Sequence, residues 1–406
     1  MINLPDAIDC VLAEVRPLAS EDVHLLAALG RAAGDGVVAD EQVPAFTNSA
    51  MDGYAVQGSL LAEGVRQFRV AAEVPAGTWV ERPIVARAAA RIMTGAPLPP
   101  GVDTVVPVEA TSLDDDVMRV LEPVRAGANV RRAGEDIAVG DVVFPRGTRL
   151  GPAEIGILAS LGRETVSVAR RPKVAILATG SELVEPGSAL APGQIRNSNS
   201  YAAYGQVVEA GGEPVMMGIA PDDVRETRRL VAAALEYDVV ITSGGVSVGD
   251  YDFVRRVEDE LGISPRFWGV AVKPGKPMAF GVRDATLVFG VPGNPVAAMV
   301  SFELYIRPAL LALQGRADLF RPFVRARASE AQPAGGNRVE LRRCRLESRN
   351  EGWSFTITGP QGSGILRSMA LADGLAVIAP GRPRGAPGEE YVVIRLEGHS
   401  TERPPL

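Results

Sequence analysis

The stretches that decide the fold are three apolar runs that each end in a glycine turn: RPKVAILATG at residues 171–180, YDVVITSGGVSVGD at 237–250 and ATLVFGVPGNP at 285–295. Short apolar runs bounded by turn residues are typical of strands buried on both faces of a parallel sheet. Helical sequence lies between and after them, at about Asp223–Leu235 and Val296–Leu313. This alternation predicts a parallel α/β domain, whose ligands bind beyond the carboxyl ends of its strands. All three glycine turns fall at that edge.

The regions on either side have a different character. Residues 1–44 read as helices, and short strands such as Phe68–Val74 then alternate with Pro/Gly turns up to Asp136. After about residue 317 the pattern is strand-like again, which predicts a small barrel. The fold class is therefore a multidomain α/β and β protein. Its predicted parts are a discontinuous, mainly helical domain (1–44 plus 137–170), an inserted β-rich domain (45–136), the parallel α/β domain (171–316) and a C-terminal β-barrel (317–406).

Composition restricts the class of protein. The net charge of −7 over 406 residues argues against nucleic-acid binding, which needs a basic surface. No apolar run of about 18 residues predicts a membrane span, and the opening MINLPDAIDC does not resemble a signal peptide. The two cysteines, Cys10 and Cys344, have no paired spacing. We therefore expect a cytoplasmic protein without a disulfide.

The histidine count restricts the chemistry further. His24 lies in an apolar, helix-like stretch and His399 in a C-terminal tail, and the chain has no other histidine. A Ser-His-Asp triad, a zinc site or a Cys-His nucleophile therefore has almost nothing to be built from. Any metal should be a hard cation bound by carboxylate and phosphate oxygens, with Mg²⁺ the first candidate.

Two segments of the α/β domain favour an anion. In the loop Ser243–Asp252, three glycines (Gly244, Gly245 and Gly249) allow successive backbone amides to turn inward as a nest. VKPGKP places Lys273 and Lys276 on either side of a Pro-Gly turn, so both ammonium groups can point the same way. A flexible connection and a turn with two solvated lysines are the plain alternatives. The companion loops ATGSE (178–182) and PGNP (292–295) at equivalent strand ends favour a site.

Three segments outside that domain, each taken alone, look like turns or a solvated surface and do not indicate a site. FTNSAMDGYA (46–55) contains the turn signal Asp52-Gly53, RIMTGAPLPPGVDTVVP (91–107) contains a Thr-Gly turn, and VRRAGEDI (130–137) reads as a solvated, salt-bridged surface.

Together, these segments resemble one family. The chain is similar, from about Pro5 to Leu396, to the molybdopterin molybdenumtransferases, which comprise the bacterial MoeA proteins and the C-terminal domain of gephyrin. The matching segments occur in the family's order: PAFTNSAMDGYAV, RIMTGAPLPPG, NVRRAGEDI, ATGSEL with GQIRNSN, SGGVSVGDYD, VKPGKPMAFG, VPGNPVAA and QGSGILRSMALADGL.

The resemblance implies an elongated homodimer of four-domain subunits, with a molybdopterin-binding α/β domain. It implies an active site between that domain and the β-rich domain of the other subunit. The implied substrates are adenylylated molybdopterin and molybdate, with release of AMP and a requirement for Mg²⁺ or a similar divalent cation. The upstream adenylyltransferase and the acceptor molybdoenzymes are implied as further partners.

The resemblance also assigns roles to residues. Catalytic roles fall on Asp52 and Thr94, supported by Asp136, and on Glu182, Asp222 and Asp252, with Glu182 and Asp252 as metal ligands. The pterin phosphate would lie on the loop that contains Ser243, Gly244, Gly245, Ser247 and Gly249. The oxyanion and the floor of the site would involve Lys273, Lys276, Pro292, Asn294, Pro295, Arg338 and Ser363.

The sequence leaves several alternatives open for the function and the substrate. The chain has Ser181 where many relatives have an acid, and Asp250-Tyr251 where a Glu-Ala or Glu-Tyr pair is common. A non-catalytic molybdopterin-binding or scaffold protein and a molybdopterin adenylyltransferase are the rival functions. Molybdate and tungstate are too similar in size for the sequence to separate them.

Overall fold

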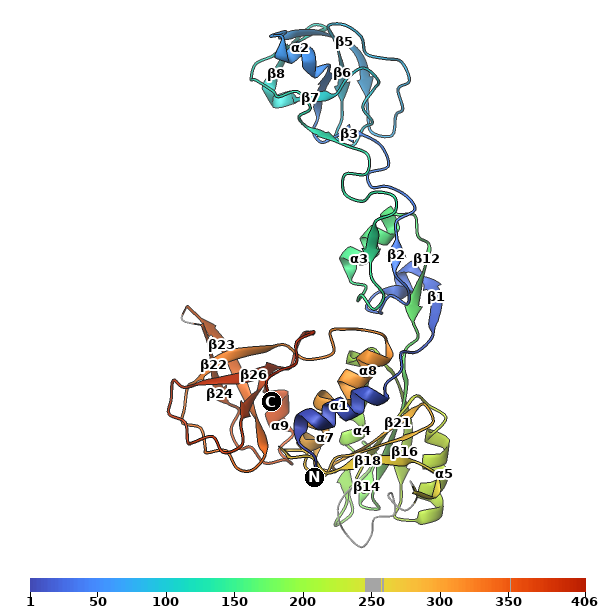
Figure 1. Cartoon of the computed structure of the whole chain (residues 1–406), viewed down its shortest axis with the longest axis vertical. Coiled ribbons are helices and arrows are strands. Elements are labelled where there is room, and N and C mark those ends of the chain that lie inside the picture. The colour runs from blue at the N-terminus through green and yellow to red at the C-terminus, as the bar shows by residue number, and fades with distance from the viewer. Residues whose placement is uncertain (245–256, 258, 351) are drawn as a thin grey trace.

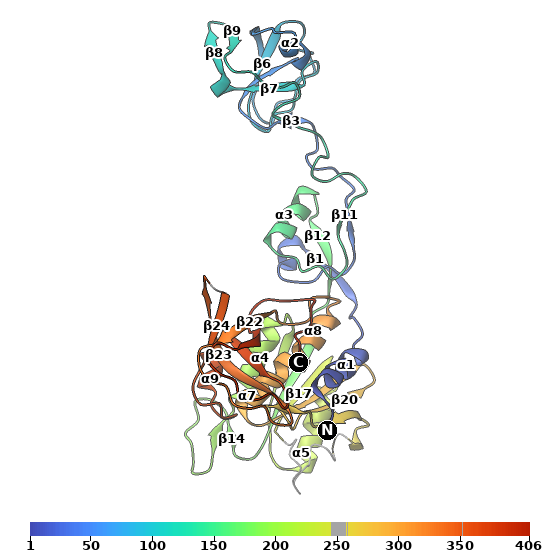
Figure 2. The ribbon, with the colours of Figure 1, turned by 60° about the vertical axis from the view of Figure 1, so that its left-hand side comes forward.

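The domains lie in a row along the long axis of the molecule in the computed structural model (Figure 1). The structure describes residues 1–244, 257, 259–350 and 352–406. The inserted β-rich domain forms one end, and the α/β domain and the C-terminal barrel lie together at the other end (Figures 1 and 2). The remaining unit, built from segments on both sides of the insertion, lies between them.

The α/β domain contains a six-stranded sheet in the order β16-β13-β17-β21-β20-β18. The three predicted strands are confirmed, and they run parallel in the centre of the sheet because their side chains are apolar on both faces. Sequence reasoning missed the edge strand β16, which is only partly buried, and the two antiparallel strands at the other edge. The bounds are β13 Lys173–Thr179, β16 Glu213–Ala220, β17 Val239–Ser243, β18 Ser264–Trp268, β20 Ala279–Arg283 and β21 Thr286–Val291.

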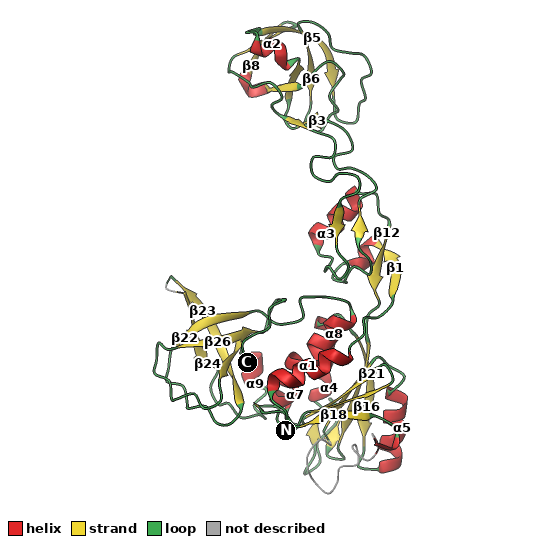
Figure 3. Ribbon diagram, in the orientation of Figure 1, coloured by secondary structure: helices red, strands yellow, loops and turns green. Residues whose placement is uncertain are grey.

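Helices cover both faces of this sheet (Figure 3). The predicted helix α5 (Val224–Ala234) begins after Asp223, whose carboxylate accepts from the Glu226 amide, and packs on one face. On the other face lie α1 (Leu4–Glu14), α4 (Asn199–Glu209) and the long helical segment Pro295–Leu313. That last segment comprises α7 (Pro295–Ser301), a π-helical stretch (Phe302–Ile306) and α8 (Arg307–Leu313).

The segment Pro295–Leu313 is apolar and, at 19 residues, long enough to cross a membrane by length and composition alone. Within the described residues it is the one helix with these properties. Of its most apolar window, 78% is buried inside the protein, as in the core helix of a globular domain.

The prediction of helices throughout residues 1–44 is wrong beyond the first helix. Leu4, Ala7, Ile8 and Val11 are buried on one face of α1, which packs into the core of the α/β domain. The segment Ser20–His24 instead forms strand β1, because it pairs antiparallel with the distant β12 (Thr165–Ala169). Long-range pairing of this kind overrides local helical preference.

The middle unit combines two small sheets with one α-helix. Its strands are β1, β2 (Val37–Val38), β11 (Val142–Phe144) and β12, and its helices are the predicted α3 (Pro152–Ser160) and the 3₁₀ turn η1 (Leu25–Ala28). A core that includes Phe144 and Leu158 holds it together. His24 ends β1, and its Nδ1 accepts from the Leu26 amide at 3.3 Å.

The inserted domain is β-rich, as predicted. Its six-stranded sheet has the order β7-β4-β6-β5-β9-β8. The strands are β4 Gly53–Val56, β5 Gln67–Val74, β6 Ala88–Ile92, β7 Thr104–Pro107, β8 Thr111–Asp114 and β9 Val117–Val120, with helix α2 Gly58–Ala62, the 3₁₀ turn η2 Val108–Ala110 and the short pair β3 Asn48–Ser49 and β10 Val130–Arg131.

The C-terminal domain is a closed barrel, because β23 pairs with both β24 and β25. Its strands are β22 Phe323–Ala328, β23 Val339–Arg349, β24 Gly352–Ile357, β25 Gly374–Ile378 and β26 Glu390–Arg395, and it has the short helix α9 Arg367–Ala370. The strand β19 (Val272–Lys273) comes from the α/β domain and pairs parallel with β23. Backbone hydrogen bonding therefore links the two domains at Lys273.

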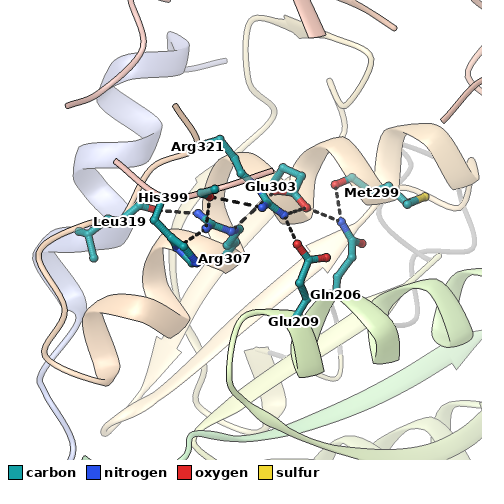
Figure 4. A network of polar contacts seen from close by, with 9 residues as sticks. Gln206, Glu209, Met299, Glu303, Arg307, Leu319, Arg321 and His399 are labelled. Atoms are coloured by element: carbon teal, nitrogen blue, oxygen red, sulfur yellow. Dashed lines mark hydrogen bonds and ion pairs between the residues drawn. The ribbon is translucent and has the colours of Figure 1, made fainter. Parts of the chain in front are cut away.

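A second link between these domains is a group of charges around three buried side chains, Glu303, Arg307 and Arg321, here called the Arg307–Arg321 cluster (Figure 4). Arg321 Nε lies 2.8 Å from Glu303 Oε2, and its NH2 group lies 2.7 Å from Glu209 on α4. Arg307 NH1 donates to the carbonyl of Leu319, and its NH2 lies 2.6 Å from His399 Nδ1. His399, which the sequence places in a C-terminal tail, is half-buried and held by this contact.

Candidate functional site

The three glycine turns come together at the carboxyl edge of the α/β sheet, as predicted. Asn199, at the start of α4, joins two of them. Its amide donates to Ser243 Oγ at 2.8 Å and to the carbonyl of Gly293 at 2.8 Å. The amide of Gly244 also donates to the carbonyl of Val291 at 3.2 Å. Sequence reasoning did not single out Asn199, although its motif GQIRNSN was part of the resemblance.

Gly244 is required by this arrangement. Its φ is +98°, and a Cβ at this position would lie 2.7 Å from the carbonyl oxygen of Thr179 on the neighbouring strand. Both the backbone conformation and the lack of space therefore favour glycine. The close approach keeps the ends of β13 and β17 together at the predicted site.

The turn after β13 is linked to the turn after β16. The Ser181 amide donates to Asp222 Oδ2 at 3.1 Å, and the Asp222 amide donates to Ser181 Oγ at 3.0 Å. Ser181 thus fixes the loop that bears Asp222. Glu182 lies next to this link and is exposed. The predicted acids Glu182 and Asp222 therefore lie on adjoining loops at one edge of the sheet.

Four predicted residues of the loop after β17 are Gly245, Ser247, Gly249 and Asp252, and they lie outside the described residues. In the part of the chain that the structure describes, no group of three or more His, Cys, Asp or Glu side chains could hold a metal ion. Glu182 and Asp222 provide carboxylate oxygens, which suit a hard divalent cation.

A cavity of about 820 Å³ opens between the α/β domain and the barrel. We call it the cationic cavity. The α/β domain supplies the turns after β19 and β21, and the barrel supplies β23 and the loop before α9. Six predicted substrate-binding residues line it: Lys273, Lys276, Pro292, Asn294, Arg338 and Ser363. A seventh, Pro295, begins α7 directly after Asn294.

Positive charge is in excess in this cavity. Arg342 and Arg343 join Lys273, Lys276 and Arg338, whereas Glu340 is the one acid among the described lining residues. Sequence reasoning missed Glu340, Arg342 and Arg343. The run VELRRCR (339–345) carries a usable signal, because alternation along a strand places residues 340 and 342 on the same face.

The wall of the cavity that contains Ser363 is held from two sides. The amide of Val296, in the first turn of α7, donates to the carbonyl of Ser363 at 3.0 Å. Arg343, only 1% exposed, donates to the carbonyl of Gly362 at 2.9 Å and to Ser368 Oγ at 3.0 Å. Burial, followed by the neighbouring Arg342, lowers the pKa of the Arg343 guanidinium. The described structure pairs this buried cation with neutral oxygens, so an anion in the cavity would be attracted to it.

The inserted domain brings Asp52 and Thr94 together, the two residues of this domain to which the resemblance assigns catalytic roles. The Thr94 amide and its hydroxyl both donate to Asp52 Oδ1 at 2.7 Å. The hydrogen bond from the Thr94 amide, followed by the one from its hydroxyl, lowers the pKa of Asp52, which is therefore an exposed carboxylate at neutral pH.

Asp136 lies elsewhere, beside the bridge between Val43 and Ile137 at the base of the inserted domain. Among the described residues, no hydrogen bond or ion pair joins it to Asp52 or Thr94. Within one chain, the inserted domain is also remote from the α/β sheet (Figures 1 and 2).

The geometry therefore provides two separate polar regions. One region combines a cationic cavity with exposed carboxylates at the edge of an α/β sheet, and can bind a doubly negative ligand. The other region is an oriented carboxylate at the far end of the molecule.

Comparison with known proteins matches three family models in sequence order. They are the MoeA N-terminal region (domain I and II) at residues 2–162, a probable molybdopterin binding domain at 175–312 and the MoeA C-terminal region (domain IV) at 325–396.

Individual proteins agree along most of the chain. A molybdopterin molybdenumtransferase of Haemophilus influenzae is 38% identical over 79% of this chain and 80% of its own. The molybdopterin molybdenumtransferase 2 of Mycobacterium tuberculosis is 37% identical over 87% and 89%. The crystal structure of a molybdopterin biosynthesis MoeA protein from Pyrococcus horikosii is 31% identical, with a TM-score of 0.82, covering 98% of this chain and 100% of that one.

Proposed function

Because this chain belongs to the MoeA family of molybdopterin molybdenumtransferases, which serves molybdenum cofactor biosynthesis, we propose that it joins molybdate to the dithiolene of adenylylated molybdopterin and releases AMP. The observation that carries the proposal is the cationic cavity beside the three glycine turns. It gives a tetrahedral dianion and a phosphorylated pterin adjoining places to bind.

The cavity has the charge needed for the oxyanion. Lys276, Arg338 and the Lys273 ammonium group offer donors that can surround a tetrahedral anion. Ser363 adds a hydroxyl from the barrel side. Since the lysines come from the α/β domain and Arg338 from the barrel, the site exists only while these two domains stay joined.

The phosphate of the pterin is assigned to the turn after β17. Ser243 and Gly244 begin this turn, and the bonds from Asn199 and to Val291 hold it next to the turn after β21. Backbone amides at such a turn can bind phosphate oxygens. The two substrates would then meet between Ser243 and Lys276.

The carboxylates fit a divalent cation. Glu182 and Asp222 lie on adjoining loops with exposed oxygens, and Asp252 is the further ligand that the family motif suggests. Mg²⁺ held there would neutralise the charge on the bridging phosphate when the phosphoanhydride is cleaved. The Ser181 hydrogen bonds keep Asp222 oriented for this role.

Asp52 and Thr94 are assigned to the same site in a second copy of the chain. They lie at the far end of the molecule from the α/β sheet, so they can take part only if another subunit brings them there. We therefore propose a homodimer with an active site shared between subunits.

The direct experiment gives the purified protein adenylylated molybdopterin, Mg²⁺ and molybdate. AMP release together with metal-loaded cofactor supports the proposal. Conversion of free molybdopterin with ATP would instead indicate the rival adenylyltransferase activity. Pterin binding without turnover would indicate the non-catalytic alternative.

A mixing experiment tests the shared site. Asp52→Ala and Glu182→Ala should each be folded and nearly inactive, and a mixture allowed to exchange subunits should recover part of the activity. A strictly monomeric protein on sedimentation, or no recovery after demonstrated exchange, would contradict the shared site.

A further inference from the structure

Glu340 is an anomaly in the cationic cavity. It is the one acid among the described lining residues, yet it stands where the proposed function places a doubly charged anion. Its Oε2 lies 3.3 Å from Lys273 Nζ, and its Oε1 lies 3.8 Å from Arg342 Nε. A pocket selected only for tight anion binding would not contain this charge.

The backbone fixes Glu340 in this position. Glu340 of β23 is the register partner of Lys273 on β19 and of Ile378 on β25. Two neighbouring strands thus hold its main chain, one from each domain. The side chain of Glu340 is 15% exposed, whereas that of Lys273 is 55% exposed, so the acid is the better-ordered partner of the pair.

The contacts of Arg342 lead to the same conclusion. Arg342 NH1 donates to Gln332 Oε1 at 2.9 Å, but its Nε is buried and donates no hydrogen bond within the described structure. The Glu340 carboxylate is the nearby negative charge that offsets this guanidinium. Glu340 therefore restrains one cation from each domain.

A negative charge at this place also opposes the ligand. An anion bound by Lys273 has to share the ammonium group with Glu340, and the two negative charges repel each other. An anion that must be transferred to a second substrate needs to bind without being trapped, and a competing internal carboxylate limits how tightly it is held.

We propose that Glu340 is a positioning residue that sets the anion affinity of the cationic cavity: it orients Lys273 and Arg342 and weakens oxyanion binding so that the anion can be passed on. The inference rests on the proposed function, because it takes molybdate as the anion. It assigns to Glu340 an effect opposite in sign to that of the neighbouring cations.

The test is a calorimetric titration of the full-length protein with molybdate, comparing the unaltered chain with Glu340→Gln. The amide keeps the size of the side chain but removes its charge. We expect molybdate to bind more tightly by on the order of fivefold, the size expected for repulsion between a dianion and one carboxylate ~8 Å apart in a water-like dielectric. Glu390→Gln is the matched control, because Glu390 pairs with Arg325 on the exposed side of the barrel.

Kinetics separate this role from a merely structural one. In Glu340→Gln we expect a lower KM for molybdate without a higher kcat, and in Glu340→Asp an affinity close to that of the unaltered chain. Unchanged or weaker binding in Glu340→Gln would overturn the inference while leaving the proposed function intact. A failure of the unaltered chain to bind molybdate would count against the proposed function itself, and the inference would fail with it.

Discussion

Two groups of charged side chains join the α/β domain to the C-terminal barrel, and they differ in how their charges are balanced. In the Arg307–Arg321 cluster, Arg321 is 6% exposed and contacts both Glu303 and Glu209, while Arg307 is bonded to backbone carbonyls and His399 (Figure 4). In the cationic cavity, the lining residues that the structure describes include five cations and one acid around about 820 Å³ of open space.

This difference in charge balance indicates a structural role for one group and a binding role for the other. A buried cation is stable when its donors are satisfied within the protein, and the Arg307–Arg321 cluster meets this condition. In the cavity, Lys273 and Lys276 are exposed to open space, so their charge is available to an anionic ligand. We therefore assign the first cluster to holding the domains together and the second to binding.

The largest expected effect comes from breaking the Arg307–Arg321 cluster. Arg321→Met leaves Glu303, which is 8% exposed, with only the hydrogen bond from Gln206 and the longer 4.0 Å ion pair to Arg307. It should lower the free energy of unfolding by about 3 kcal/mol, the lower end of the range for breaking a buried ion pair. Urea denaturation measures this loss. Arg325→Met is the control, because its exposed pair with Glu390 should contribute at most about 0.5 kcal/mol. Equal small losses in both variants would refute the structural assignment.

The next largest effect is a loss of activity when a cation of the cationic cavity is removed. Lys276→Ala should reduce molybdenum insertion by roughly 100-fold or more, the usual cost of removing one preorganised charge from a reacting anion, with little change in the melting temperature. Lys173→Ala is the matched control, since Lys173 lies at the amino end of β13, at the opposite edge of the sheet. Near-normal turnover in Lys276→Ala would remove this lysine from the site.

A Glu→Gln substitution in each of the two groups compares their contributions to the free energy of unfolding. Glu303→Gln should destabilise the protein by roughly 1–3 kcal/mol, because it leaves two buried arginines with less compensation. Glu340→Gln should have a smaller effect, below about 1 kcal/mol, because Lys273 is half exposed and Arg342 keeps its hydrogen bond to Gln332. Thermal and urea unfolding of the two variants give the answer, and a reversed order would contradict the distinction.

A smaller effect is the pH dependence of protein stability that His399 of the Arg307–Arg321 cluster should cause. Burial, followed by Arg316 and Arg307, lowers the pKa of His399 from 6.5 to about 4, although Asp318 opposes the shift. The unfolded chain therefore binds the proton more readily than the folded chain, and stability should fall as the pH drops from about 6.5 toward 4.

Because the His399 ring is half exposed, we expect a loss on the order of 1 kcal/mol after screening. His399→Gln should flatten the pH dependence in this window when denaturation is followed from pH 7 to 4.5. An identical slope in both proteins would show that His399 does not titrate as described.

Prediction from the sequence succeeded where the signal is local. Apolar runs ended by glycine gave β13, β17 and β21, and the motif resemblance gave six residues of the cationic cavity. It failed where distant segments decide the outcome. Strand β1 forms because β12 pairs with it, and His399 is ordered because Arg307, 92 residues away, contacts it.

The residues missed at the site have the same explanation. From the sequence alone, Glu340 and Arg342 look like surface charges on a barrel strand. They line the cavity because β19 of the α/β domain pairs with their strand, β23. Asn199 reads as an ordinary helix start, and its role follows only from the simultaneous contacts with Ser243 and Gly293. No local pattern specifies such long-range contacts.

The most direct test of the central claim is the location of molybdate in a crystal of this protein, determined from the anomalous scattering of molybdenum. The account predicts the strongest peak inside the cationic cavity, within hydrogen-bonding distance of Lys276 and Arg338. A strongest peak outside this cavity, with the cavity itself occupied only by water, would contradict it.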